Sequence, residues 1–509
     1  MSSIKKLAGQ TMWYGVSSIA AKFINYLLTP YLTYTLAKTS DYGKMGLIYA
    51  AISFLSIIFT YGFETTYFRF SLRKEYKSSL YNTAALSLIF STLLFTILLW
   101  LVRDPFADII GLKDVPTIAY IGIFIIAFDS LGAIPFDKLR LEERPRKYAL
   151  IKVGGIVINI FFVWFFIGYC PSQIASNSNS FVLLFYNSHT NPIVYVLIAN
   201  LIQSVFTLLL LSKEVSMIKW QFNFTLWKQM IIYALPLVIV GMGGMINETF
   251  DRLMLRWWLP VSPIYADQQV GIYNACYKLA ILITLFVAAF KLGAEPFFFK
   301  QAEEQNPQKV YARVMKFFVI IVTIMFLLVS MYLPIWKHFI GPKYWAGLRV
   351  VPILLLANIF LGIYYNLAIW YKLTQKTLSG AYITMIGATI TVIFNYIFIP
   401  RYGYMACAWT TFLCYFIMMI LCYIWGQKVY RIPYALKKLC AYIVIVVLLF
   451  FIHEGIVHFF KGNLTNFISA TLLLVLYVWF VLNIEWKEFQ RLPVIGKYFK
   501  SGNIVVRNR

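Results

Sequence analysis

Apolar runs of about twenty residues, the length needed to cross a membrane as a helix, recur from one end of the chain to the other. A helix satisfies its own backbone hydrogen bonds in lipid, and no run alternates apolar and polar residues as a barrel strand does. The pattern predicts fourteen membrane-spanning helices, near residues 11–34, 42–63, 79–101, 117–137, 148–169, 192–212, 229–258, 269–294, 312–335, 348–370, 377–399, 403–426, 434–452 and 465–484.

The composition agrees with a chain that lies in lipid. Hydrophobic residues make up 61% of the 509 residues and charged residues only 13%, whereas about a quarter of an ordinary soluble domain is charged. The net charge of +25 is spread over many short loops, so we do not expect a nucleic-acid partner. Most Lys and Arg of the loops lie on the side of the two termini, which predicts that both termini are cytoplasmic. The opening segment MSSIKKLAGQ has no signal-peptide cleavage pattern, so we expect the first helix to remain.

An internal repeat relates the second and eighth apolar runs. Gly43 and Tyr49 in the second run match Gly271 and Tyr277 in the eighth, with the same spacing in both. Such repeats are typical of transporters in which two halves, related by an axis along the membrane normal, rock against one another.

The repeat and the apolar runs together predict an all-α polytopic membrane protein with two pseudo-symmetric six-helix lobes. We place the N-terminal lobe at residues 1–213 and the C-terminal lobe at residues 214–427. Residues 428–509 then hold two extra helices and a basic cytoplasmic tail.

Four charged residues interrupt the end of the seventh run, in the segment GMINETFDRLMLRWWLP. A charged side chain is costly at the centre of a lipid-facing helix, so such residues normally face a wet cavity or a partner. On one continuous helix Glu248, Asp251, Arg252 and Arg256 share a face. We expect the two arginines to line a cationic cavity, with the two acids as counter-ions or ion-coupling groups. Two alternatives stay open, an internal pair between Glu248 and Arg252 and an interfacial helix end whose charges reach into water.

Three further charges lie inside predicted spans. Lys22 is near the middle of the first run and Lys278 is in the eighth, and both are expected to add positive charge to the cavity. Asp129, in the fourth run, is expected to be either the counter-ion of Lys22 or a group that couples transport to an ion.

A second group of charges lies near the inner ends of the runs. Lys291 and Glu295 are four residues apart, and Glu64 holds the related place in the first half, so we expect an inner gate closed by ion pairs. The histidines and cysteines lack metal-ligand spacing, so no metal site is expected. There is no phosphate-binding GKS/T loop, so we expect no cofactor. The energy for transport would come from an ion gradient such as Na+ or H+, from the gradient of the substrate itself, or from a partner.

Four segments carry a resemblance to a known family: WYGVSSIAAKFINYLLTPYLTYTLAKTSDYGKMGLIYA, IPFDKLRLEERPRKYA, VGIYNACYKLA and NYIFIPRYGYMACAWTT. In this order and spacing they resemble the polysaccharide flippases of the multidrug/oligosaccharidyl-lipid/polysaccharide exporter superfamily, over residues 8–427. The resemblance implies a multi-pass protein of the bacterial cytoplasmic (inner) membrane. It also implies transport of a polyprenyl-pyrophosphate-linked oligosaccharide for surface polysaccharide such as lipopolysaccharide. The implied partners are membrane lipids and a polysaccharide polymerase or glycosyltransferases.

Three alternatives accompany this interpretation. A lipid II flippase and a multidrug cation antiporter belong to the same superfamily, and an antiporter for cations would favour an acidic cavity. A membrane polysaccharide polymerase or ligase typically has a large outer loop with catalytic Arg or His, whereas the longest outer loop here has no Arg. The sequence therefore favours a transporter over an enzyme.

Overall fold

The computed structural model describes residues 20, 23–24, 26–71, 73–76, 78–176, 181–302, 304–460 and 462–490. Within these ranges the secondary structure is helical, and thirteen helices are long and apolar enough to cross a membrane. They coincide with the second to fourteenth predicted spans. The first predicted span lies largely outside the described residues, and α2 (Leu28–Thr35) contains its end. The predicted fold class, an all-α polytopic membrane protein, is confirmed.

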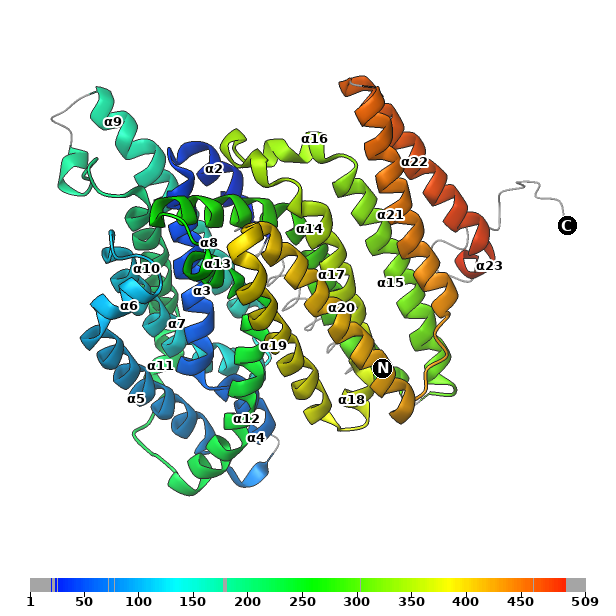
Figure 1. Cartoon of the computed structure of the whole chain (residues 1–509). Helices are drawn as coiled ribbons and strands as arrows, with labels where there is room; N and C mark the ends of the chain where they lie inside the picture. Colours follow the sequence, from blue (N-terminus) through cyan, green and yellow to red (C-terminus); the bar gives the residue numbers. More distant parts are fainter. Residues whose placement is uncertain are drawn as a thin grey trace, which may run out of the picture. The chain divides into compact units, whose positions relative to one another are not determined.

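By their internal contacts, Met1–Glu304 and Lys337–Tyr430 form a first compact unit. Its long helices run alongside one another (Figure 1). Besides α2, its α-helices are α3 (Thr39–Thr60), α4 (Phe63–Ser71), α5 (Leu80–Leu101), α6 (Arg103–Ile109), α7 (Thr117–Leu141), α8 (Pro145–Trp164), α9 (Cys170–Ser176), α10 (Pro192–Leu210), α11 (Ser212–Ser216), α12 (Phe224–Glu248), α13 (Asp251–Trp258), α14 (Pro263–Gln301), α17 (Val350–Leu367), α18 (Ile369–Leu373), α19 (Thr377–Tyr402) and α20 (Tyr404–Val429).

Gln305–Trp336 and Arg431–Arg509 form a second compact unit. Its helices are α15 (Pro307–Ser330), α16 (Leu333–Trp336), α21 (Leu436–Phe459), α22 (Asn463–Ile484) and α23 (Trp486–Phe489). The predicted lobes follow the sequence repeat and not the contacts, so their boundaries at residues 213 and 427 stay a prediction.

Local sequence signals explain where several helices begin. Pro145 and Pro192 occupy the first turns of α8 and α10, where a missing N–H costs nothing. The Asn191 side chain accepts a hydrogen bond from the N–H of Ile193 at 2.9 Å, and Asn223 caps α12 in the same way. These caps satisfy N–H groups that a helix start leaves without partners.

The first unit is organised around a close crossing of α3 and α14. A Cβ added to Gly43 would lie 1.9 Å from the carbonyl oxygen of Asp267, and a Cβ added to Gly271 would lie 2.1 Å from that of Thr39. Each glycine therefore packs against the carbonyl four residues before the other glycine. Such a reciprocal contact has two-fold symmetry, and it joins the glycines that the sequence repeat matches.

A buried carboxylate ties together three helices of the second unit. Glu485 is 1% exposed, and its Oε atoms accept from Lys316 at 2.5 Å, Lys438 at 2.7 Å and Tyr442 at 2.8 Å. These partners come from α15 and α21. Burial raises the pKa of the Glu485 carboxyl, but the hydrogen bonds from these three groups outweigh it and hold the pKa below its usual value of 4.5.

We predict that Gly43→Ala destabilises the first unit. The added methyl group has no space beside the Asp267 carbonyl, and overpacking of this kind costs about 1–3 kcal/mol. Thermal unfolding of the purified full-length protein should therefore begin at a lower temperature. Gly154→Ala is the matched control, because a Cβ there meets nothing within 4 Å and alanine favours a helix. Equal midpoints of thermal unfolding for Gly43→Ala and Gly154→Ala would contradict the close crossing of α3 and α14.

We predict that Glu485 makes stability depend on pH. Because its folded pKa is depressed, its contribution is complete above the unfolded pKa near 4.5 and is lost as the pH falls through the lower folded value. The difference in unfolding midpoint between the wild type and Glu485→Gln should be largest at neutral pH and shrink below 4.5. The control Glu304→Gln removes an exposed carboxylate. A gap between wild type and Glu485→Gln that is independent of pH would exclude this role.

Candidate functional site: a polar cavity

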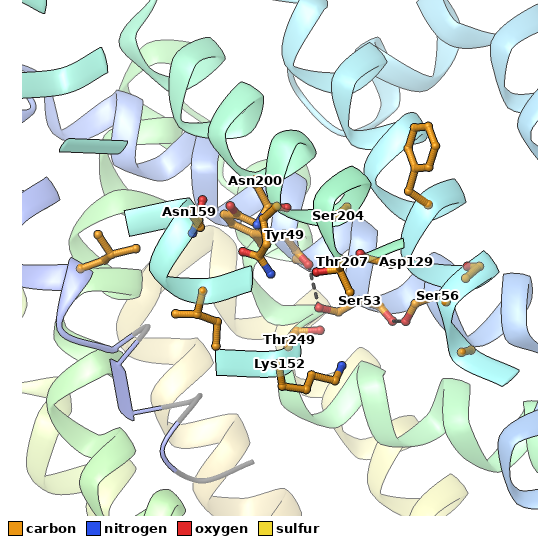
Figure 2. Close-up of a pocket in the computed structure, with 18 of the residues that line it drawn as sticks. Tyr49, Ser53, Ser56, Asp129, Lys152, Asn159, Asn200, Ser204, Thr207 and Thr249 are labelled. Carbon is orange, nitrogen blue, oxygen red and sulfur yellow. Dashed lines mark hydrogen bonds between the residues drawn. The ribbon is translucent and has the colours of Figure 1, made fainter. Parts of the chain in front are cut away.

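The first unit encloses a cavity of about 740 Å³. Its walls come from α2, α3, α4, α7, α8 and α10, together with α13, α14 and the link before α13 (Figure 2). Because hydroxyl, amide and charged side chains make up much of the lining, the cavity suits a hydrated or polar ligand.

Two stripes of neutral polar side chains face the cavity. On α3, Tyr49, Ser53, Ser56 and Thr60 recur at helical spacing, and α10 carries a similar stripe. We define the amide face as five lining residues of α8 and α10: Asn159, Asn200, Gln203, Ser204 and Thr207. The charge-based sequence analysis missed these residues, although their spacing along apolar runs is the signal that marks one face of a helix.

Seven charged residues also line the cavity. The cations are Arg140, Lys152, Arg252 and Lys278, and the anions are Glu64, Asp129 and Asp137. Arg140 donates to the Asp137 carboxylate at 3.2 Å. Of the residues predicted from the sequence, Arg252, Lys278, Asp129 and Glu64 therefore lie at the cavity, whereas the sequence analysis did not single out Lys152, Asp137 or Arg140.

Arg252 is buried in a network at the junction of α13 and α14. Its Nη1 donates to the Asp251 carboxylate at 2.9 Å and to the Glu248 carbonyl at 3.1 Å, and its Nε donates to the Asn274 side chain at 3.2 Å. Tyr277 stacks below the guanidinium, with the ring centre 4.6 Å from Cζ. An arginine has five N–H donors. Tyr277 also forms a side-chain hydrogen bond with Arg252, so the protein holds the guanidinium in place where it lines the cavity.

Lys278 lies one helical turn beyond Asn274, on the same side of α14. Its ammonium faces the cavity, and no carboxylate of the described chain forms an ion pair with it. Lys278 is therefore a cation that depends on water or a ligand for its neutralisation.

The predicted span over 229–258 is not one continuous helix. α12 ends at Glu248, and the N–H of Phe250 bonds to the carbonyl of Met245, five residues back. This wide turn frees the Glu248 carbonyl for Arg252 and changes the direction of the charges that follow. The shared face predicted for the four charges is therefore wrong. The Glu248 side chain is exposed and is not part of the lining, and Asp251 lies behind Arg252 with Tyr273 donating to it at 2.6 Å.

Arg256 lies outside the lining, in a seal at the end of the cavity near Thr39 and Pro263. Its Nε donates to Asp267 at 2.7 Å. Its side chain packs on Gly111, whose φ of +82° favours glycine.

Two further contacts complete this seal. Trp257 donates to the carbonyl of Ile109 at 2.5 Å, and Lys44 forms an ion pair with Asp114. Together with the Gly43 crossing, these contacts join α3 and the connection between α6 and α7 to α13 and α14. The cavity is therefore closed at this end.

The opposite end of the cavity carries part of the predicted inner gate. Glu64 lines the cavity there. Lys291 lies outside the main lining, with its Nζ 4.6 Å from the centre of the Tyr365 ring. The Glu295 side chain and Lys22 lie outside the described residues, so the pairing of Lys291 with Glu295 and the role of Lys22 stay predictions.

We predict that Arg256→Ala loosens the seal. In a Cys440→Ser background, which removes the exposed native thiol, a Ser53→Cys substitution places a reporter thiol in the lining. A membrane-impermeant thiol reagent added from the Thr39 side should label this reporter several-fold faster when Arg256 is lost, because its side chain then no longer packs across the seal on Gly111. Lys113→Ala breaks an exposed ion pair with Asp108 and serves as the control. Unchanged labelling in the Arg256→Ala protein would show that the Arg256 side chain does not hold the seal.

Comparison with known proteins gives a family and a fold. A family model described as "Polysaccharide biosynthesis protein" matches residues 7–302. The structure is similar to that of a lipid II flippase, MurJ, in an inward closed conformation, with a TM-score of 0.71 and 14% identity over 92% of this chain and 98% of that one.

The structure is also similar to a multidrug resistance MATE family transporter of the MOP superfamily. The inward-facing form gives a TM-score of 0.56 and 14% identity over 84% of this chain and 96% of that one. The outward-facing form gives a TM-score of 0.54 and 14% identity over 86% of this chain and 96% of that one. Curated protein sequences give no match. At this level of identity the structural likenesses establish the fold.

Proposed function

Because the chain belongs to the polysaccharide biosynthesis protein family, we propose that it is a flippase for a polyprenyl-pyrophosphate-linked oligosaccharide. The oligosaccharide moves from the cytoplasmic to the outer face of the membrane by alternating access. The observation that carries the proposal is the cavity itself, which combines neutral polar stripes with two cations, Lys278 and Arg252. Within the described part of the chain, Lys278 forms no ion pair with a carboxylate. Both cations come from α13 and α14, so they face the same part of the cavity.

The physical obstacle to this transport is the headgroup. A pyrophosphate with several sugars loses its hydration in hydrocarbon and gains nothing in return. In the cavity the pyrophosphate meets the ammonium of Lys278 and the guanidinium of Arg252, and charge-assisted hydrogen bonds to phosphate replace those lost to water. The polyprenyl chain stays in lipid. A cationic drug is a poorer cargo for this site, because no carboxylate of the described residues forms an ion pair with Lys278.

The seal sets the direction in which the cavity opens. With both termini in the cytoplasm, as the distribution of Lys and Arg favours, the end near Thr39 and Pro263 faces outward. The conformation described here is then closed to the outside and receives its cargo from the cytoplasmic side. Export requires α3 and α14 to separate at the Gly43 crossing and Arg256 to leave its place beside Gly111.

The remaining parts of the proposal follow from the same function. The membrane is the bacterial inner membrane, and a polysaccharide polymerase or glycosyltransferases act before or after transport. Movement is driven by a Na+ or H+ gradient, and Asp129, a carboxylate of the lining, is the group proposed to couple it. Lys22, if it faces the cavity, adds to the positive charge for the pyrophosphate.

We predict that Lys278→Gln slows transport about tenfold or more, because a hydrogen bond to a charged group contributes about 1.5–3 kcal/mol. In cells that lack the native gene and carry the variant, mass spectrometry should find the lipid-linked oligosaccharide accumulating, with surface polysaccharide reduced and protein level unchanged. Lys278→Arg keeps the charge and should restore transport in part. Arg401→Gln, which removes an exposed cation outside the lining, is the control. Normal surface polysaccharide with Lys278→Gln would remove this residue from the transport site.

A further inference from the structure

The two sides of the cavity differ in charge. Among the lining residues, α13 and α14 contribute two cations, Arg252 and Lys278, and no carboxylate. The side built from α3, α4, α7, α8 and α10 contributes three carboxylates and two cations, and one cation is already paired with Asp137. On that side Glu64 and Asp129 therefore face the cavity against a single free-standing cation, Lys152, whose Nζ lies over the Phe136 ring at 4.2 Å.

A buried polar atom on the same side lacks a partner. Asn159 is 5% exposed, and within the described chain its Oδ1 accepts no hydrogen bond. Ser204 forms a side-chain hydrogen bond with Asp129. Leaving such atoms unpaired is costly, and buried polar atoms without partners are rare. Asn159 lines the cavity, where Figure 2 shows Asn159, Asn200 and Thr207 around the same space.

The chemistry of this side fits sugars. Amide and hydroxyl groups exchange neutral hydrogen bonds with the hydroxyls of a pyranose ring, and each such bond contributes a modest amount. A carboxylate such as Asp129 accepts hydrogen bonds from sugar hydroxyls, but it repels a second carboxylate strongly where little water screens the charge. Placing like charges against an unwanted ligand is a common way to reject it.

We propose that the amide face, together with Asp129, binds the saccharide part of the substrate and selects a glycan of uncharged sugars. This inference rests on the proposed flippase function. Neutral hexoses and N-acetylated amino sugars fit the face, whereas uronic or sialic acids bring their carboxylates against Asp129 and Glu64. The substrate then lies across the cavity, with its pyrophosphate on Lys278 and Arg252 and its sugars on α8 and α10.

The test uses purified full-length protein and three radiolabelled probes in equilibrium dialysis. The probes are geranyl diphosphate, geranyl diphosphate bearing a neutral trisaccharide, and the same compound with one hexose replaced by its uronic acid. The probe that bears the neutral trisaccharide should bind with a Kd about tenfold lower than that of geranyl diphosphate alone. This difference corresponds to one or two net hydrogen bonds. The uronic acid probe should lose this gain.

Two variants separate the sides of the cavity. Asn200→Leu combined with Gln203→Leu should abolish the gain from the trisaccharide and leave the Kd of geranyl diphosphate unchanged. Asp129→Asn should bring the uronic acid probe to within about threefold of the neutral one, since the opposing charge is removed. Asn366→Leu makes the same change at a buried asparagine outside the lining and should leave all three Kd values unchanged.

The outcomes distinguish the two proposals. If the uronic acid probe binds the wild type as tightly as the neutral probe, or if the double variant weakens geranyl diphosphate as much as the trisaccharide, the sugar-binding face is excluded and the flippase function is untouched. If the wild type binds none of the diphosphate probes, the proposed function falls, and the sugar-binding face falls with it.

Discussion

The approach of α3 to α14 is the constraint on which the cavity depends. Two glycines, Gly43 and Gly271, let backbone carbonyls occupy the space where side chains would otherwise stand. The crossing closes the cavity at one end and fixes how far the α3 stripe lies from Lys278 on α14. Around it Arg256 packs on Gly111 and pairs with Asp267, whose side chain is 3% exposed. Loss of Arg256 would leave this buried carboxylate without that partner, which is costly. The closed end therefore opens only for a ligand that binds the open state more tightly.

The same region explains why two buried cations play different parts. Arg252 has its counter-ion, Asp251, next to it in the chain, and the break between α12 and α13 gives it a free carbonyl. Its orientation is therefore set before any ligand arrives, which lowers the cost of binding. Within the part of the chain that the structure describes, Lys278 has no such partner, so its charge is left for a ligand to neutralise. An arginine held in a fixed orientation beside a lysine ammonium is a suitable pair for a pyrophosphate, because arginine supplies a planar set of donors and lysine supplies a compact charge.

The sequence predicts the membrane-spanning helices, which the lipid environment requires, and misses features that depend on tertiary packing. Thirteen spans are predicted well because every helix in hydrocarbon must show an uninterrupted apolar run, and the repeat of Gly43 and Gly271 marks the crossing because only glycine fits there. The site is predicted in part. Arg252, Lys278 and Asp129 reach the cavity because a charge inside a span needs polar surroundings. The prediction that Arg256 lines the cavity is wrong, because it assumes one unbroken helix. The wide turn at Phe250 ends that helix and changes the direction of the residues that follow. Nothing in the local sequence requires that turn.

A substrate held by both sides of the cavity has a consequence for the transport cycle. A ligand shifts a conformational equilibrium only by its difference in affinity between the states. If the pyrophosphate lies on Lys278 and the sugars lie on the amide face, the full set of contacts exists only while α14 and α10 keep their present separation. Binding then favours this conformation, and a motion that separates α14 from α10 lowers the affinity for the headgroup. Because sugar hydroxyls and phosphate oxygens are both well hydrated in water, a cavity that opens to the outside replaces the lost contacts with water and completes release without a covalent step.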